Sequence, residues 1–221
     1  MRLAVVFTKE EPVMFVSHLD VQRLFQRAFR RAKLPLAYSQ GFNPHPLLSF
    51  ATALSVGVTS RCEYLDVILT ERMDAEEFKR RVSETLPEGI SIKEVFDLGD
   101  TGKSLSSAMK TADYKVSAVF DRPISGDELC RALEGLLSGE IVVMKKTKGG
   151  IKPTDIRPMV LYARITEVNE DRALIMIKGV LTSSGGLNPG VFINELANRL
   201  GAGIKAGIER TNIEMDRGML N

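Results

Sequence analysis

The sequence predicts an α+β protein of two domains in tandem, and three observations lead to this fold class. The chain has 221 residues, more than a usual single domain and enough for two hydrophobic cores. Hydrophobic residues make up 44% and charged residues 26%, the balance of a soluble globular protein rather than a disordered or fibrous one. Strand-like and helical periods alternate on both sides of a Gly- and Ser-rich stretch at residues 99–112.

The first half, residues 1–98, divides into six expected elements. Arg2–Thr8 is apolar and β-branched, as in a buried strand. Ser17 is the expected N-cap of a helix that runs to about Lys33, because its hydroxyl can accept a hydrogen bond from the backbone of Asp20. Two strands, a second helix and a last strand are expected at residues 48–54, 63–69, 75–85 and 90–96.

The second half, residues 113–221, shows a similar order of elements. Strands are expected at residues 113–120, 141–147, 160–168, 173–182 and 207–215, and helices at residues 126–137 and 189–200. The order βαββαβ is that of the ferredoxin-like split unit. We therefore expect two ferredoxin-like domains in tandem, at residues 1–98 and 113–221, with a linker at residues 99–112.

The first expected helix carries a basic face. Arginines recur at helical spacing opposite its apolar side, and residues 17–60 contain a single acid, Asp20. A solvated surface is one explanation of such a face. However, the planar guanidinium group also matches phosphate geometry, which favours a nucleic-acid backbone as ligand. The arginines are Arg23, Arg27, Arg30 and Arg31.

The densest polar segment is Tyr38–Pro46, which has neither a helical nor a strand period. Gly41, Pro44 and Pro46 should hold its backbone in a rigid turn, with a positive φ or a close backbone approach at Gly41. We expect an exposed binding loop that offers hydrogen-bonding groups and aromatic rings to RNA or to a partner protein. The residues concerned are Tyr38, Gln40, Phe42, Asn43 and His45.

Three side chains of these segments are weak candidates for catalysis. His18, Asp20 and His45 would form an acid–base or metal constellation if the loop folded over the start of the helix. The simpler reading assigns Asp20 to a capping box with Ser17 and leaves His18 exposed in the first turn. We therefore expect a protein without a catalytic site, a metal or a cofactor of its own.

A second basic block lies at residues 140–164, which contain six Lys or Arg residues and only two acids, Glu140 and Asp155. This block looks like a strand end followed by a loop. It supports nucleic-acid binding more weakly than the basic face of the first expected helix does. Asp155 and Arg157 stand two residues apart, as in a structural ion pair on an extended chain. The candidate ligand-binding residues are Lys145, Lys146, Lys148 and Arg157.

Four runs of residues together resemble one bacterial family, the radical SAM-associated proteins, a domain of unknown function. These runs are Phe15–Asp20, Tyr38–Pro46, Glu63–Asp66 and Asp155–Pro158. The family occurs alone or fused to the C-terminus of a radical SAM protein, so the resemblance implies a radical SAM partner. Its genes tend to lie near those for a ribonuclease and a ribosomal protein, which implies work on RNA or the ribosome.

The chain is not itself the radical enzyme, because Cys62 and Cys130 are its only cysteines and no CxxxCxxC motif is present. Paired ferredoxin-like domains also resemble tRNA pseudouridine synthases and CRISPR RNA-processing proteins, but a fold does not transfer an activity. No apolar stretch approaches the ~18 residues of a membrane span. The sequence thus predicts a cytoplasmic accessory module that binds RNA or the ribosome. Two alternatives are an enzyme using His18, Asp20 and His45, and a protein–protein adaptor for the radical SAM partner.

Overall fold

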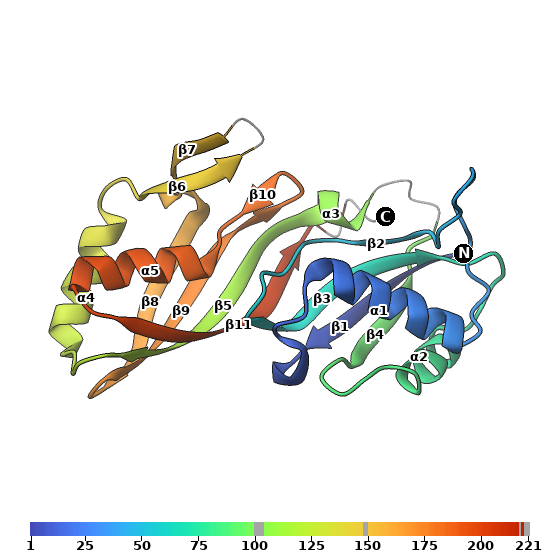
Figure 1. Cartoon of the computed structure of the whole chain (residues 1–221), viewed down its shortest axis with the longest axis horizontal. Coiled ribbons are helices and arrows are strands. Elements are labelled where there is room, and N and C mark those ends of the chain that lie inside the picture. Colours follow the sequence, from blue (N-terminus) through green and yellow to red (C-terminus); the bar gives the residue numbers. More distant parts are fainter. Residues whose placement is uncertain (100–103, 148–149, 217, 219–221) are drawn as a thin grey trace. The chain divides into compact units, whose positions relative to one another are not determined.

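The computed structural model describes residues 1–99, 104–147, 150–216 and 218. The chain divides into two compact units: residues 1–110 together with 212–221, and residues 111–211. Each unit combines antiparallel strands with helices, which confirms the α+β class (Figure 1). Within the described residues, no helix is long and apolar enough to cross a membrane.

The first unit contains four strands in the spatial order β2-β3-β1-β4, and each neighbouring pair is antiparallel. Two helices separate the strands along the chain, so the sequence order is β1, α1, β2, β3, α2, β4. The bounds are β1 Arg2–Lys9, α1 His18–Arg31, β2 Leu48–Phe50, β3 Val58–Ile68, α2 Ala75–Ser83 and β4 Ile92–Asp97.

Apolar side chains of α1 and α2 bury one face of these strands. The core joins Leu3, Val5 and Phe7 of β1 to Leu65 and Val67 of β3 and to the buried faces of both helices. Aromatic rings meet edge-on within it, as the 4.7 Å between the ring centroids of Phe7 and Phe25 shows. The hydroxyl of Ser17 accepts the amide of Asp20, so the expected N-cap of α1 is confirmed.

The second unit contains the path β10-β9-β5-β11, and β8 also pairs with β9. Helix α5 begins with Pro189 and is capped by the side chain of Asn188. The bounds are β5 Met109–Phe120, α4 Gly126–Leu137, β8 Val160–Asn169, β9 Arg172–Thr182, β10 Gly185–Gly186, α5 Pro189–Leu200 and β11 Ile204–Met215.

A separate two-stranded sheet interrupts the second unit between α4 and β8. It consists of β6, Val142–Thr147, and β7, Gly150–Asp155. The sequence predicted the first strand but not the second, because Gly150 and Pro153 are residues that usually mark loops. The expected strand with a loop is therefore a β-hairpin.

The region expected to be a linker is partly regular. Within residues 99–112, α3 spans Leu105–Ala108 and β5 begins at Met109, while residues 100–103 lie outside the described part of the chain. The side chain of Ser104 caps α3 by accepting a hydrogen bond from the amide of Ser107. The serines at this point therefore begin a short helix rather than form a spacer.

Candidate functional site

The segment 38–46 is a closed loop whose two ends are hydrogen-bonded to each other. The backbone amide of Ser39 donates to the carbonyl of His45 at 2.9 Å, and Tyr38 and Pro46 form an isolated β-bridge. The hydroxyl of Ser39 accepts the amide of His45 at 3.1 Å and lies 2.9 Å from its Nδ1. These contacts fix the loop without any help from a ligand.

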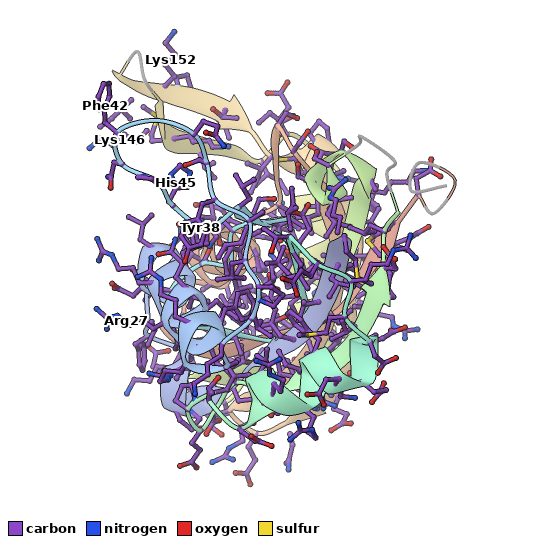
Figure 2. All side chains as sticks on the ribbon, turned by 90° about the vertical axis from the view of Figure 1, so that its right-hand side faces the viewer. Arg27, Tyr38, Phe42, His45, Lys146 and Lys152 are labelled. Carbon is purple, nitrogen blue, oxygen red and sulfur yellow. The ribbon has the colours of Figure 1, made fainter. Side chains whose placement is uncertain are left out.

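The tip of this loop is exposed. Gly41 has a φ of 118°, which confirms the positive φ expected there. The side chain of Phe42 is fully exposed and that of Tyr38 is 41% exposed, although both rings are largely apolar. Gln40, Asn43 and His45 are exposed as well. Figure 2 shows Phe42 pointing outward from the loop.

The four arginines of α1 are all exposed but differ in their contacts. Arg23 forms an ion pair with Asp20 at 3.0 Å, and Arg31 donates to the carbonyl of Thr85 at 2.6 Å. Asp20, the single acid of residues 17–60, thus neutralises part of the basic face at Arg23. Arg27 and Arg30 form no ion pair within the described residues, and Figure 2 shows Arg27 pointing outward from α1.

His18 is half-buried rather than exposed. Its ring centroid lies 5.3 Å from that of Phe50, and its Nε2 lies 3.4 Å from the side-chain nitrogen of Gln22. Burial lowers the pKa of His18 below its usual 6.5; nearby Glu63 opposes this shift and Lys9 reinforces it. The surroundings of the ring therefore favour its neutral form.

Lys9 and Glu63 are buried charged residues next to this histidine, each only 3% exposed. Burial lowers the pKa of Lys9, and the carboxylate of Glu63 opposes that shift. The ammonium group donates to the carbonyl of Met14 at 2.9 Å. Sequence reasoning missed both residues, although a charge at an inward position of an apolar strand was the available signal.

The three weak catalytic candidates have separate partners. His18 contacts Phe50, Asp20 accepts from Ser17 and Arg23, and His45 contacts Ser39. Among residues 1–99, 104–147, 150–216 and 218, no three His, Cys, Asp or Glu side chains are grouped so that they could hold a metal ion. The constellation that the sequence suggested is thus not assembled.

The second basic block lies mostly on the hairpin. Lys145 and Lys146 are exposed on β6, whereas Lys148 lies outside the described residues. Arg157 is half-buried at the base, where its guanidinium donates to the carbonyls of Leu137 at 2.6 Å and of Val160 at 3.0 Å.

Asp155 does not take up the guanidinium of Arg157 as expected. Its Oδ1 accepts instead the backbone amides of Ile141 at 2.8 Å and of Arg157 at 2.9 Å. Arg157 therefore ties the base of the hairpin to α4 and β8, and Asp155 joins the two chain segments at that base, so both side chains have a structural role.

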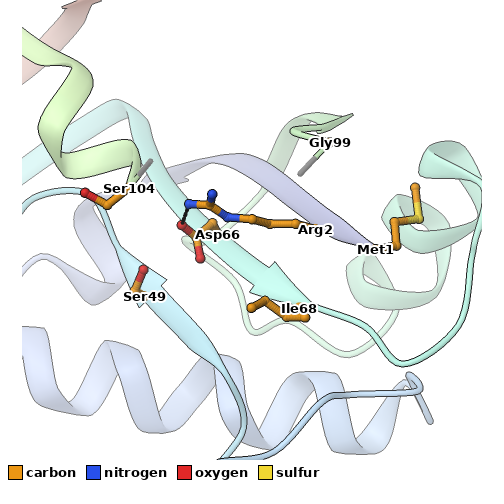
Figure 3. Close-up of a pocket in the computed structure, with 7 residues that line it drawn as sticks. All are labelled: Met1, Arg2, Ser49, Asp66, Ile68, Gly99 and Ser104. Carbon is orange, nitrogen blue, oxygen red and sulfur yellow. Dashed lines mark hydrogen bonds and ion pairs between the residues drawn. The ribbon is translucent and has the colours of Figure 1, made fainter. Parts of the chain in front are cut away.

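A cavity of about 500 Å³ in the first unit was not foreseen (Figure 3). An ion pair of 2.7 Å between Arg2 and Asp66 lies in its wall, with side-chain exposures of 16% and 9%. Asp66 ends the run Glu63–Asp66, so that run has a buried acid at its last position. The lining residues are Met1, Arg2, Ser49, Asp66, Ile68, Gly99 and Ser104.

Fold and site together define an α+β protein with an exposed, preformed loop beside a basic helix. Residues 2–189 match a bacterial family described as "Uncharacterized protein conserved in bacteria (DUF2344)", and the chain belongs to this family. All four motif runs identified in the sequence fall within the matched residues. Comparison with curated protein sequences gives no match.

Solved structures share the fold at low sequence identity. A chain of a Cbf5-Nop10-Gar1 complex has a TM-score of 0.58 and 10% identity over 96% of this chain and 48% of its own. A chain of an H/ACA RNP bound to a substrate RNA containing 2'-deoxyuridine gives 0.54 and 11%, over 95% and 47%. An archaeal box H/ACA sRNP Nop10-Cbf5 complex gives 0.54 and 11%, over 96% and 48%. This chain thus spans about half the length of these chains, and the likeness shows the fold alone.

Proposed function

We propose that this protein is a non-catalytic RNA-binding module that acts with a radical SAM protein. The RNA would lie on the first unit, on the loop 38–46 and the basic face of α1. The observation that carries the proposal is the loop, which is closed by its own hydrogen bonds yet holds Phe42 fully exposed at its tip. A rigid loop pays little entropy on binding, so its groups are suited to recognition.

Arginine supplies the electrostatic part of the proposed contact. Arg27 and Arg30 are exposed on α1 and carry charge that no ion pair in the described part of the chain neutralises. A polyanion binding there releases condensed counterions, which makes association favourable at low salt. The guanidinium fork also fits a phosphate better than a solvated ammonium group does.

Aromatic rings supply the part of the contact that reads bases. Tyr38 and Phe42 are exposed on the same loop as the amide side chains of Gln40 and Asn43. Unpaired bases stack on such rings, at about 1–3 kcal/mol per base, and their edges accept and donate hydrogen bonds. This arrangement favours single-stranded RNA segments over uniform duplex at the first unit.

The likeness in fold to chains of an H/ACA RNP with bound RNA and of a box H/ACA sRNP complex adds weight to an RNA ligand. The fold we propose for each unit is the ferredoxin-like one. In the first unit, the order β2-β3-β1-β4 supports it, and in the second unit β8-β9-β5-β11 does so once the β6–β7 hairpin is set aside as an insertion.

The proposal of a radical SAM partner rests on the family resemblance of the sequence motifs. The alternative of a protein–protein adaptor would use the same loop, with Phe42 filling a pocket of the partner enzyme. The alternative of an enzyme is less favoured, because His18, Asp20 and His45 are engaged by separate neighbours. We expect the domain arrangement to place RNA recognition in residues 1–98.

Charge reversal on α1 tests the proposal. R27E/R30E should weaken binding of RNA at least about tenfold and reduce its salt dependence, because two phosphate contacts are lost. The thermal midpoint should stay nearly unchanged, since surface substitutions cost little stability. Fluorescence anisotropy with a labelled single-stranded RNA, repeated over a salt series, measures both quantities.

The matched control is R72E/K93E, which makes the same change of charge at two exposed residues of the first unit outside α1 and the loop. If the control weakens binding as much as R27E/R30E, RNA responds only to total charge and the assigned surface is wrong. If neither the native protein nor any variant binds RNA, but the radical SAM protein still co-purifies with the native protein, the adaptor alternative replaces the proposal.

A further inference from the structure

The β6–β7 hairpin of the second unit is anchored at its base. The amide of Ile156 donates to the carbonyl of Ile141 at 2.9 Å, and both residues are buried. Beyond them the two strands form a sheet of their own and project from the unit (Figure 1). An isolated two-stranded hairpin is marginally stable in water, so its sequence is not explained by the needs of a core.

One face of the hairpin places like charges together. Lys145 lies directly opposite Lys152 in the register, and directly opposed residues of an antiparallel pair share a face. Both are exposed, and two like charges at this position weaken the pairing of the strands. A bound polyanion would remove this repulsion. Figure 2 shows Lys152 extending outward from the hairpin.

The opposite face is apolar and equally open. Met144 and Ile151 are each 67% exposed and Val142 is 52% exposed. The register places Met144 against Pro153 and Ile151 against Lys146, so these side chains share one face with a single lysine among them. Apolar groups grouped on an exposed ribbon usually mark a contact surface.

We propose that the β6–β7 hairpin is a second RNA contact and that it binds base-paired RNA. The ribbon would enter the groove edgewise, so that Lys145 and Lys152 on one face contact phosphates of one strand. Lys146, Met144 and Ile151 on the other face would lie against a phosphate and the sugars of the opposite strand. This inference rests on the proposed function, and it assigns the paired part of the ligand to the second unit.

Two features select base-paired RNA as the occupant. Residues 142–155 contain no aromatic residue, so the hairpin lacks the stacking platform that unpaired bases need. Base-paired RNA is recognised instead by shape and by phosphate and 2′-hydroxyl contacts across a wide, shallow minor groove. A second copy of the chain is disfavoured, because the lysines of two hairpins would repel and Pro153 interrupts one open edge.

Neutral substitutions on each face test the inference separately. K145Q/K152Q should weaken binding of an RNA duplex of about 20 base pairs by about fivefold and make the logarithmic salt slope shallower by about 2, one for each phosphate contact. M144S/I151S should weaken the same binding while leaving the salt slope unchanged, because no charge is lost. Anisotropy with the labelled duplex gives both values.

The matched control is K115Q/K205Q, which neutralises two exposed lysines of the same unit on β5 and β11. Relief of repulsion also predicts that the thermal midpoint of K145Q/K152Q is equal to or above that of the native protein. A lower midpoint with duplex affinity lost only in proportion to the unfolded fraction would overturn the inference.

The remaining outcomes separate this inference from the proposed function. If the native protein binds single-stranded RNA through α1 and the hairpin variants bind duplex as the control does, the inference fails and the proposed function stands. If the native protein binds no RNA of either kind, both fail. If duplex binding is unchanged but an acidic protein no longer co-purifies with K145Q/K152Q, the hairpin is a protein-docking surface and the inference is wrong.

Discussion

At the scale of single residues, the arginines of α1 differ in how much charge they offer a ligand. Arg23 is already paired with Asp20, a carboxylate whose pKa is lowered by its hydrogen bonds to Ser17 and Arg23. Arg31 is held by the carbonyl of Thr85. The spacing of the four residues in the sequence made them equivalent, and only the contacts single out Arg27 and Arg30.

His18 predicts a pH dependence of stability. Its pKa in the folded protein lies below 6.5, with burial as the largest cause, so below about pH 6.5 the unfolded chain binds more protons than the folded one. Stability should therefore be full above pH 6.5 and fall as the pH decreases from 6.5 toward 5. His18→Gln should flatten this fall, as measured by urea unfolding at several pH values.

The control for this measurement is His45→Gln, since His45 is the chain's only other histidine and is exposed. An equal flattening in both variants, or a native protein whose stability is constant from pH 7 to 5, would contradict the assigned role of His18. A positive charge on His18 would interact with the buried Glu63 and Lys9 beside it, the first favourably and the second unfavourably.

At the scale of elements, sequence patterns predicted those features of helices and strands that depend on neighbouring residues in the chain. The cap at Ser17 follows from a bond between its side chain and the backbone three residues on, and it is confirmed. Strand β7 was missed because its glycine, lysine and proline carry no apolar period, and only its pairing with β6 defines it as a strand. A pairing between strands is not encoded in either strand by itself.

The loop 38–46 has some features that its composition predicted and others that it did not. Its exposure and the positive φ of Gly41 followed from its composition. Its closure by Ser39 and His45 did not, because a hydrogen bond between two side chains across a turn depends on the path of the backbone. Likewise the Arg2–Asp66 pair joins residues 64 positions apart, beyond the reach of any local pattern.

The loop also supports a prediction about recognition. Q40A/N43A/H45A should abolish binding of single-stranded RNA while costing under about 1–2 kcal/mol of stability, because the three side chains are exposed. The backbone hydrogen bond from Ser39 to His45 and the Tyr38–Pro46 bridge remain in this variant, so the loop keeps its closure. Anisotropy and thermal unfolding of the same sample give the two values.

The companion substitution Phe42→Ala removes only the stacking ring and should weaken binding without changing its salt slope. If the triple variant unfolds the protein, and RNA binding is lost only in proportion to the unfolded fraction, the loop is a structural plug. The binding surface would then have to be sought elsewhere on the first unit.

At the scale of the whole molecule, the division of the chain departs from its order in sequence. We expected residues 113–221 to form one domain, yet residues 212–221 group with residues 1–110. The amide of Asp216 donates to the carbonyl of Ala108 at 2.8 Å, and its carboxylate pairs with Lys110 at 2.9 Å. Periodicity reports the type of an element, but it does not report which core that element joins.

The last prediction follows from this division. Ile213 is only 6% exposed and belongs to the first unit, so Ile213→Ala removes buried apolar volume there and should cost about 2–4 kcal/mol. Asp216→Asn weakens the partly exposed ion pair with Lys110 and should cost less than about 1 kcal/mol. Amide hydrogen exchange of Ile213→Ala should rise in peptides from residues 1–110 more than in those from residues 111–211, although residues 204–211 precede Ile213 directly in β11. Faster exchange confined to residues 111–211 would instead return the C-terminal segment to the second unit.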